Sequence, residues 1–179
     1  MNELEGIKVF LSGAMDRCDD DGIEWRQEFR EKAIKAGLDF KYFDPTDKPD
    51  GVAPEIGLEK HAIKQALKEG NWAYASEQSQ EVRHVDLRMI DSTNLYVVYL
   101  DLNVHACGTY NEFFVAEEQQ KPQFVIMAPG FEKYDIPLWL IGIVREEEVF
   151  AGINDCIDYL VEINAGEIEQ DERWLRINV

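Results

Sequence analysis

The sequence predicts an α/β protein with a doubly wound parallel β-sheet that carries helices on both faces. Apolar, β-prone runs alternate along the chain with amphipathic helical patterns, which is typical of βαβ units. In addition, residues 94–100 (NLYVVYL) are almost all apolar, and such a run indicates a strand buried on both faces of a parallel sheet. A chain of 179 residues, 45% of them hydrophobic, can bury a real core, so we expect one domain over residues 1–179.

The first half of the chain alternates strands and helices between clear stop signals. Trp25, Phe29 and Ala33 recur four residues apart and Gly37 follows them, which indicates an amphipathic helix ended by glycine. From such patterns we expect a strand at residues 7–11, the helix that Gly37 ends, a strand at 40–43, a loop rich in Pro, Gly and Asp at 47–57, and helices at 56–67 and 77–91.

The second half continues the alternation. From the same patterns we expect a strand at residues 94–100, a loop at 101–107, a helix at 109–119, a strand at 123–127, a short apolar piece at 137–144, a helix near 154–163 and an edge strand at 174–179. Ligands of doubly wound sheets bind at the carboxyl ends of the strands. We therefore expect the site in the segments 12–15, 44–46 and 101–112.

The charge of the chain argues against several classes of partner. With 18 Lys and Arg against 36 Asp and Glu, the formal net charge is −18, and a chain this acidic repels nucleic-acid backbones and anionic membrane surfaces. No apolar run approaches the ~20 residues of a membrane span. The three cysteines are far apart and the first residues are acidic, so we expect no signal peptide and a cytoplasmic protein.

Residues that could hold a metal or a nucleotide cofactor do not form a known site pattern. His84 lies on a predicted helix and His105 is close to Cys107, but no third and fourth ligand has the spacing of a metal site. The turn at residues 12–14 (SGA) resembles neither a dinucleotide fingerprint nor a phosphate-binding P-loop. We therefore expect no metal, nicotinamide cofactor or ATP.

Asp86 is a carboxylate on an apolar helix face. It lies four residues after Val82 and four before Ile90, so it points the same way as these apolar side chains. A carboxylate directed inward is costly unless it is paired or neutralised, and desolvation raises its pKa. Such a group can act as a general acid. The alternative is a buried Asp paired with Arg83, Arg88 or a backbone amide.

Glu112 lies in the first turn of the helix predicted after the strand 94–100. Thr109 and Glu112 fit the capping-box pattern, in which Thr109 caps the helix and Glu112 reaches back to its amide. The alternative is functional, because a helix N-terminus favours an ionised carboxylate, and an ionised carboxylate at the end of a strand is a nucleophile. Gly108 would let a substrate approach the backbone closely.

Asp86 and Glu112 together suggest a site in which one carboxyl group is neutral and the other is ionised. Environments that separate two carboxyl pKa values in this way are typical of acid–base chemistry at a glycosidic carbon. In such chemistry the ionised group attacks the anomeric carbon through an oxocarbenium-like transition state, and the neutral group protonates the leaving group.

Several short motifs resemble the nucleoside 2-deoxyribosyltransferase family. Their order and spacing together are fairly specific, and the resemblance spans residues 7–127. The motifs are the first strand and turn at 9–15 (VFLSGAM), residues 43–46 (FDPT), Asp86-Leu87 with Ile90, the strand 94–100 with Asp101, and Gly108-Thr109-x-x-Glu112 followed by Ala116 and Lys121-Pro122.

The resemblance implies a flavodoxin-like fold and transfer of the 2-deoxyribosyl group of a nucleoside to another nucleobase, through a covalent sugar–enzyme ester and without a cofactor. By motif match, Glu112 would be the nucleophile and Asp86 the acid or base that handles the nucleobase. The implied partners are a deoxynucleoside and a free nucleobase, and the resemblance favours a homo-oligomer. The same match implies substrate contacts at Ser12, Gly13, Met15, Asp44, Asp101, Gly108 and Thr109.

The chain departs from the family pattern at two positions. Members often have a Tyr in the first strand that contacts the nucleophile, where this chain has Phe10, and Tyr110 could substitute for it. Some members hold the sugar 5′-hydroxyl with an Asn from a neighbouring subunit, and the corresponding residues 136–139 (IPLW) contain no Asn. Two alternatives therefore stay open: hydrolysis of the N-glycosidic bond of a (deoxy)nucleoside 5′-monophosphate, and nucleotide binding without catalysis.

Overall fold

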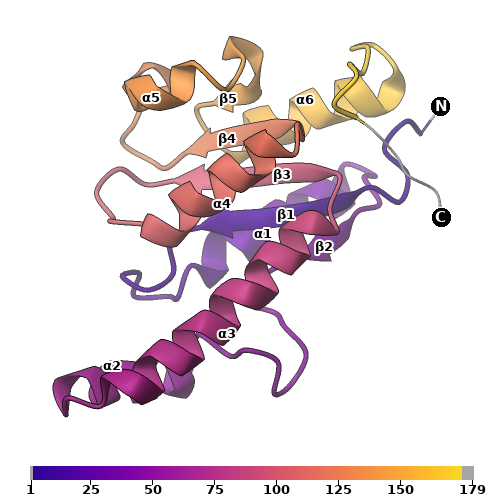
Figure 1. Cartoon of the computed structure of the whole chain (residues 1–179). Coiled ribbons are helices and arrows are strands. Elements are labelled where there is room, and N and C mark those ends of the chain that lie inside the picture. Colours follow the sequence, from indigo (N-terminus) through magenta and orange to yellow (C-terminus); the bar gives the residue numbers. More distant parts are fainter. Residues whose placement is uncertain (1, 175–179) are drawn as a thin grey trace.

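The computed structural model describes residues 2–174 of the chain. Its centre is a five-stranded parallel β-sheet with the strand order β2-β1-β3-β4-β5 (Figure 1). This is the order of flavodoxin-like doubly wound sheets, and it confirms the fold class expected from the sequence. The strands are β1 (Lys8–Gly13), β2 (Lys41–Phe43), β3 (Leu95–Leu100), β4 (Gln123–Met127) and β5 (Val149–Phe150).

The middle of the sheet is β3, the strand expected from the apolar run at 94–100. It lies between β1 and β4, and Val97 aligns with Leu11 on one side and with Phe124 on the other. All three side chains are almost fully buried. A strand covered on both faces needs apolar side chains at successive positions, which is why this run lacks polar alternation.

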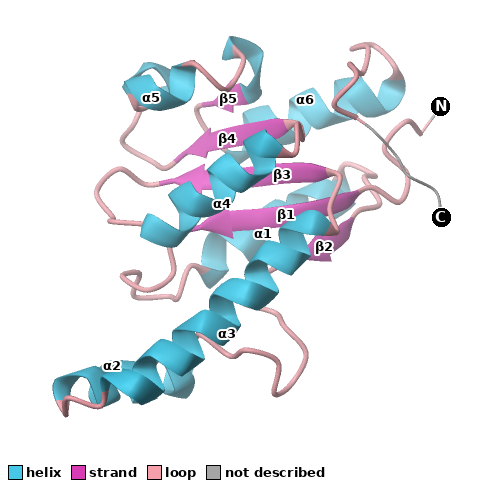
Figure 2. Cartoon of the chain, in the orientation of Figure 1, coloured by secondary structure: helices cyan, strands magenta, loops and turns pink. Residues whose placement is uncertain are grey.

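Helices cover both faces of the sheet (Figure 2). On one face, Leu11 of β1 belongs to a core cluster with Trp25 of α1 and Leu160 of α6. On the other face, Tyr96 of β3 belongs to a second cluster with Phe113 of α4. Successive strand residues point to opposite faces, so each strand contributes to both clusters. The helices are α1 (Ile23–Lys35), α2 (Gly57–Lys68), α3 (Trp72–Asp91), α4 (Cys107–Glu118), α5 (Leu138–Ile141) and α6 (Ile153–Ala165), with short 3₁₀ turns at Lys133–Asp135 and Glu146–Glu148.

The helical pair of α2 and the first turns of α3 projects away from the sheet (Figure 1). α3 begins at Trp72 rather than at residue 77, because Asn71 caps it: the Asn71 side chain accepts a hydrogen bond from the Tyr74 backbone N–H at 3.2 Å. Within residues 2–174, no helix combines the length and the apolar character that crossing a membrane requires.

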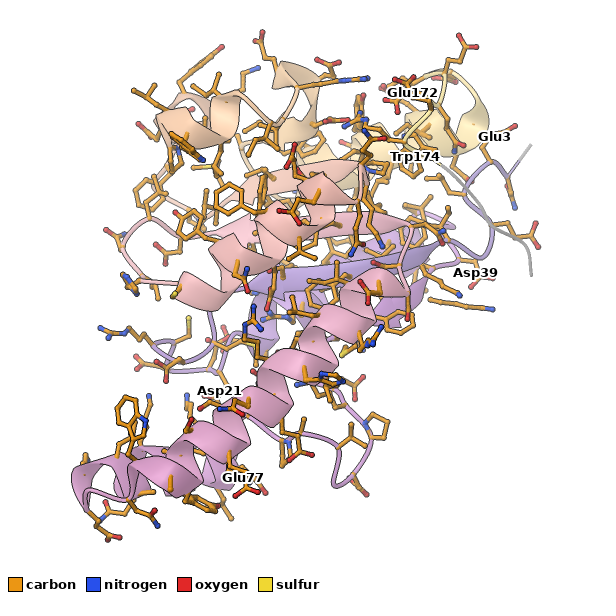
Figure 3. The ribbon with its side chains drawn as sticks, in the orientation of Figure 1. Glu3, Asp21, Asp39, Glu77, Glu172 and Trp174 are labelled. Atoms are coloured by element: carbon orange, nitrogen blue, oxygen red, sulfur yellow. The ribbon has the colours of Figure 1, made fainter. Side chains whose placement is uncertain are left out.

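The edge of the sheet next to β4 differs from the sequence expectation. It is formed by β5, a two-residue strand that aligns Val149 with Val125 and that is too short to give a periodic signal. Of the edge strand expected at 174–179, residues 175–179 lie outside the described part of the chain. Trp174 is described and buried, with its ring 6.0 Å from that of Phe124 (Figure 3), so it belongs to the core.

Candidate active site

A cavity of about 360 Å³ lies beside the carboxyl ends of β1 and β3. Met15 lines it from the turn after β1, and Glu55 lines it from the loop between β2 and α2. Asp86 of α3 and Glu112 of α4 line it as well, next to Gly108. The structure therefore brings both carboxylates singled out in the sequence to one cavity, at the end of the sheet where doubly wound folds bind ligands.

Glu112 does not belong to a capping box. α4 begins at Cys107, its N-cap is Ala106, and no side chain caps it, so the predicted cap at Thr109 is wrong. The helix starts earlier because the chain turns directly from the β3 loop into it. This places Glu112 beside the end of β1, where its Oε2 accepts a hydrogen bond from the Ser12 hydroxyl at 2.5 Å.

A tyrosine from β3 lies next to this hydrogen bond. Tyr96 pairs with Phe10 across the sheet, and their rings stack with centroids 5.8 Å apart. The Tyr96 hydroxyl donates to the Thr109 carbonyl at 3.2 Å and interacts with both Ser12 and Glu112. Tyr96, rather than Tyr110, is therefore the tyrosine beside Glu112, and Phe10 of the first strand orients it by stacking.

The carboxyl group of Glu112 has a pKa close to neutral pH. Burial raises its pKa to about 7, the hydrogen bond from Ser12 opposes the rise, and the negative charge of Asp86 adds to it. From its place at a helix N-terminus we expect the ionised form of Glu112 to be favoured, whereas desolvation outweighs the hydrogen bond and raises its pKa. Glu112 thus changes its protonation state across the physiological pH range.

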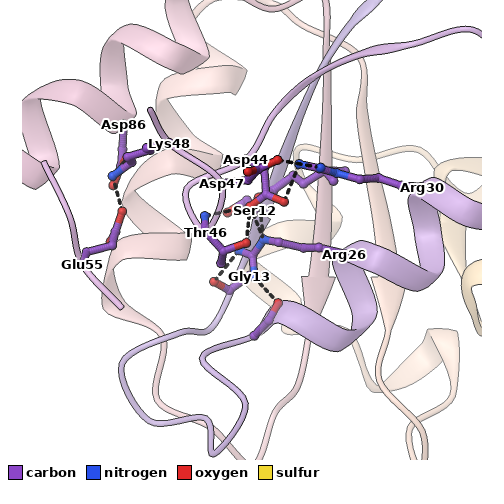
Figure 4. Close-up of polar contacts among 12 residues, drawn as sticks. Ser12, Gly13, Arg26, Arg30, Asp44, Thr46, Asp47, Lys48, Glu55 and Asp86 are labelled. Carbon is purple, nitrogen blue, oxygen red and sulfur yellow. Dashed lines mark hydrogen bonds and ion pairs between the residues drawn. The ribbon is translucent and has the colours of Figure 1, made fainter. Parts of the chain in front are cut away.

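Asp86 is buried, with 6% of its surface exposed, and it does face inward as the sequence predicts. Its partner, however, is none of the candidates weighed above. Lys48 places its Nζ 2.7 Å from Asp86 Oδ1 and also contacts Glu55 Oε1 (Figure 4). Burial raises the pKa of Asp86, while Lys48 lowers it. Asp86 is therefore one member of a three-residue cluster, which we call the Lys48 cluster: Lys48, Glu55 and Asp86.

Glu55 and Lys48 are site residues that the sequence analysis missed. Burial and the charge of Asp86 raise the pKa of Glu55 to about 8, in opposition to Lys48. The negative charges of Glu55 and Asp86 in turn raise the pKa of Lys48. The one available signal was position, because the loop 47–57 follows the carboxyl end of β2, where ligands of this fold class bind.

Asp44 takes part in a buried ion-pair network rather than in the cavity lining described here (Figure 4). Its carboxylate lies 3.3 Å from Arg26 Nε and 2.7 Å from Arg30 Nη2. It also accepts hydrogen bonds from the backbone N–H and the hydroxyl of Thr46 at 2.8 and 2.7 Å. A substrate contact by Asp44 stays a prediction, while its observed contacts fix the turn after β2.

Arg26 is almost fully buried and ties the end of β1 to α1. Its guanidinium donates to the carbonyls of Leu11 and Gly13 at 3.2 Å each and to that of Gly22 at 2.6 Å. Gly22 has a φ of 73°, and a Cβ there would come within 2.6 Å of Arg26 Nη1. The buried side chain of Arg26 therefore holds the turn that leads to Met15. In the sequence, Arg26 looks like an ordinary polar position of a helix.

The structure places some of the other residues with a predicted substrate contact at the cavity and others away from it. Met15 and Gly108 line the cavity. Gly13 is buried, and a Cβ there would lie 3.0 Å from the Trp25 ring, so the ring would have to shift to admit a side chain at this position. Asp101 follows β3 and is not among the described lining residues; its carboxylate accepts from the Asn103 N–H at 2.9 Å.

Comparison with known proteins identifies the fold. No protein-family model matches the sequence, and no curated protein matches it. Among solved structures, a 2-deoxyribosyltransferase from Bacillus psychrosaccharolyticus aligns with a TM-score of 0.57 and 18% sequence identity, over 85% of this chain and 91% of that chain. The CMP N-glycosidase of Clostridium botulinum aligns with a TM-score of 0.46 and 14% identity, over 86% and 96%. The first match confirms, at the level of the fold, the resemblance stated from the motifs.

Proposed function

We propose, starting from a fold shared with a 2-deoxyribosyltransferase, that this protein transfers a 2-deoxyribosyl group between nucleobases. In this proposal Glu112 is the nucleophile, and Asp86 belongs to the group that handles the proton of the nucleobase. The observation that carries the proposal is the meeting of these two carboxyl groups in one cavity, with Glu112 fixed by Ser12.

The geometry supports a two-step retaining reaction. The Ser12 hydroxyl donates a hydrogen bond to Glu112 Oε2. The other oxygen, Oε1, faces Gly108, where even an added Cβ would lie 3.9 Å away. Oε1 is therefore the oxygen with room for a sugar. Oε1 attacks C1′, the C1′–N bond breaks, and its electron pair stays on the base nitrogen, where the base takes up a proton. A second base then attacks C1′ from the other side, which breaks the ester and frees a proton.

Ser12→Ala tests how the nucleophile is tuned. Glu112 reacts as the carboxylate, so the rate of cleavage is expected to rise with pH through a pKa of about 7. The Ser12 hydroxyl stabilises the ionised form, and a hydrogen bond to a charged group contributes about 1.5–3 kcal/mol. Without it, the rising limb of the pH profile of kcat/KM should move to higher pH by about one to two units. An unmoved limb would mean that the 2.5 Å contact does not tune Glu112.

The direct test of the proposed function is an exchange assay. The protein is incubated with deoxyinosine and free adenine, and the products are separated by chromatography. Deoxyadenosine supports transfer, whereas hypoxanthine with free deoxyribose indicates that water accepts the sugar. If neither appears, and a deoxynucleoside monophosphate is not cleaved either, the protein is a binding module without catalysis.

A second candidate function is hydrolysis of a nucleoside 5′-monophosphate. It is favoured by one specific observation: Lys60, Lys64 and Arg83 line the cavity of a chain whose net charge is −18. Lys60 pairs with Asp21, and Lys64 with Asp16 at 2.7 Å. Both lysines are thus already paired with carboxylates, so Arg83, which donates to the Asn111 side chain, is the cation left for a phosphate at this cavity.

Arg83→Gln separates the two candidate functions. Arg83 is exposed and donates to Asn111 Oδ1 at 3.2 Å, so the substitution should not disturb the core. If a 5′-phosphate binds here, KM for a deoxynucleoside monophosphate rises about tenfold or more, while KM for the nucleoside does not change. Arg88→Gln, an exposed position further along α3, is the matched control. Equal KM values for both substrates in wild type and Arg83→Gln would rule out a phosphate contact by Arg83.

A further inference from the structure

We propose that Glu55 holds the proton that the leaving nucleobase receives, as one half of a carboxyl pair that Lys48 joins to Asp86. The inference rests on the proposed function, because it assigns the acid of that reaction. It differs from the motif-based assignment, in which Asp86 alone handles the nucleobase. Neither Lys48 nor Glu55 belongs to any of the motifs on which the family resemblance rests.

The contacts of Lys48 are the first support. Its Nζ donates hydrogen bonds to Glu55 Oε1 and to the Ala53 carbonyl, the latter at 3.2 Å, and it forms an ion pair with Asp86 Oδ1 at 2.7 Å. The side chains of Lys48 and Asp86 are 5% and 8% exposed, whereas that of Glu55 is 18% exposed. Glu55 is therefore the more accessible of the two carboxyl groups, and it lines the cavity together with Glu112.

The charge balance of the cavity wall is the second support. Two carboxyl groups share one ammonium group, the charge of Glu112 raises the pKa of Glu55, and the charge of Asp86 raises the pKa of Glu112. Carboxyl groups so close together do not all ionise, so one of them keeps a proton. The other charged side chains at the cavity are Lys60 and Lys64, each with its own Asp partner, Arg83 and Asp16. Buried Arg26 also acts on Asp86 and favours its ionised form.

The proton is assigned to Glu55 rather than to Asp86. Burial raises the pKa of Asp86 and Lys48 contacts both carboxyl groups, but Arg26 is a second cation that favours the carboxylate of Asp86. Burial and the neighbouring negative charges raise the pKa of Glu55 to about 8. At neutral pH the Lys48 cluster therefore contains an ionised Asp86, a charged Lys48 and a protonated Glu55, whose interaction with Asp86 favours the Asp86 carboxylate.

One proton transfer accompanies each of the two steps that transfer the sugar. As Glu112 forms its bond to C1′ and the C1′–N bond breaks, the Glu55 proton passes to a ring nitrogen of the leaving base, and Glu55 becomes a carboxylate beside Lys48. When the incoming base attacks C1′ and the ester breaks, the N–H proton of that base returns to Glu55. No oxidant, metal or further reactant is needed.

Glu55→Gln tests the assignment with one donor whose base needs an acid and one whose base does not. Gln keeps an oxygen for Lys48 but has no acid proton. Deoxyguanosine needs protonation of its base, whereas its N7-methylated cation leaves without it. We expect kcat for deoxyguanosine to fall about a hundredfold and kcat for the methylated donor to stay near the wild-type value. Equal losses with both donors, or no loss with either, would overturn the proposal, because a residue that only holds the loop cannot distinguish the donors.

The pH profile and a surface control sharpen the test. Wild-type cleavage of deoxyguanosine should decline above pH about 8 as Glu55 ionises, and this decline should be absent from the residual activity of Glu55→Gln. Glu77→Gln, an exposed position on the projecting part of α3 (Figure 3), should behave as wild type with both donors. A decline that persists in Glu55→Gln would contradict the assignment of Glu55.

A titration without substrate keeps this inference separable from the proposed function. Side-chain carboxyl carbons of the ¹³C-labelled protein are followed by NMR from pH 4 to pH 10, and the Glu55 resonance is identified by its loss in Glu55→Gln. A midpoint near 8 supports the proposal, and a midpoint near the ordinary value of about 4.3 overturns it. If the wild type cleaves no donor, the proposed function and the transfer of the proton fail together, while the titration still decides whether Glu55 holds that proton.

Discussion

Glu112→Gln is expected to lower the rate of deoxyribosyl transfer by at least about a thousandfold. The amide is isosteric and still accepts the Ser12 hydrogen bond, but its oxygen is a poor nucleophile. In the wild type, a reaction quenched during turnover should give a deoxyribosyl mass increment on the peptide that contains Glu112. Single-turnover kinetics and peptide mass spectrometry measure the two effects. An adduct on another peptide would refute Glu112 as the nucleophile.

The stability of the Glu112→Gln variant is the control. The linkage between proton binding and folding predicts in which direction this stability changes. The pKa of Glu112 is about 7 in the folded protein, above the value of about 4.3 in an unfolded chain. A raised pKa means that this carboxyl group stabilises the fold at low pH and loses that contribution as the pH rises toward 7. Glu112→Gln should thus be at least as stable as the wild type at pH 8 in urea unfolding. A less stable variant would show that Glu112 has a mainly structural role.

Arg26→Met is expected to lower the free energy of unfolding by about 3–5 kcal/mol. Met retains most of the volume of the side chain but leaves three buried carbonyls, those of Leu11, Gly13 and Gly22, without their donor. It also removes one of the two arginines that neutralise buried Asp44. Equilibrium unfolding in urea, read from the midpoint with an unchanged slope, measures the loss.

Arg88→Met is the matched control for this stability prediction. Arg88 is exposed, and its ion pair with Asp91 at 3.3 Å lies on the surface of α3, where such pairs contribute about 0–1 kcal/mol. Equal losses in the two variants would contradict the structural role of Arg26. A double variant that adds Asp44→Asn should recover part of the loss, because it removes the buried charge that Arg26→Met leaves with Arg30 alone.

The fold was largely predictable because its signals are local. The strands β1, β3 and β4 begin and end within a residue or two of their expected bounds, since uninterrupted apolar runs and glycine or proline stops act within a short stretch of chain. α3 was predicted too short, because the cap at Asn71 is a single hydrogen bond. β5 was missed, because a two-residue strand has no period.

The candidate site was predictable only in part. Asp86 was found because a carboxylate interrupts an apolar helix face, and Glu112 because it follows the end of a buried strand. Tyr96, Lys48 and Glu55 were not found, since each acts through partners distant in sequence. Tyr96 looked like any other residue of an apolar strand, and its hydroxyl acquires a role only where α4 passes β1.

The sequence by itself determined the parallel sheet, its flanking helices and the two carboxylates at one end, because side-chain periodicity and strand ends are properties of short segments. Only the tertiary structure decided which carboxyl group holds a proton. Protonation depends on the water removed from a group and on the charges brought beside it, and here those charges come from the loop that carries Lys48 and Glu55, from α3 and from α4. The sequence suggested a neutral Asp86 and an ionised Glu112, whereas packing pairs Asp86 with Lys48 and brings the pKa of Glu112 close to neutrality.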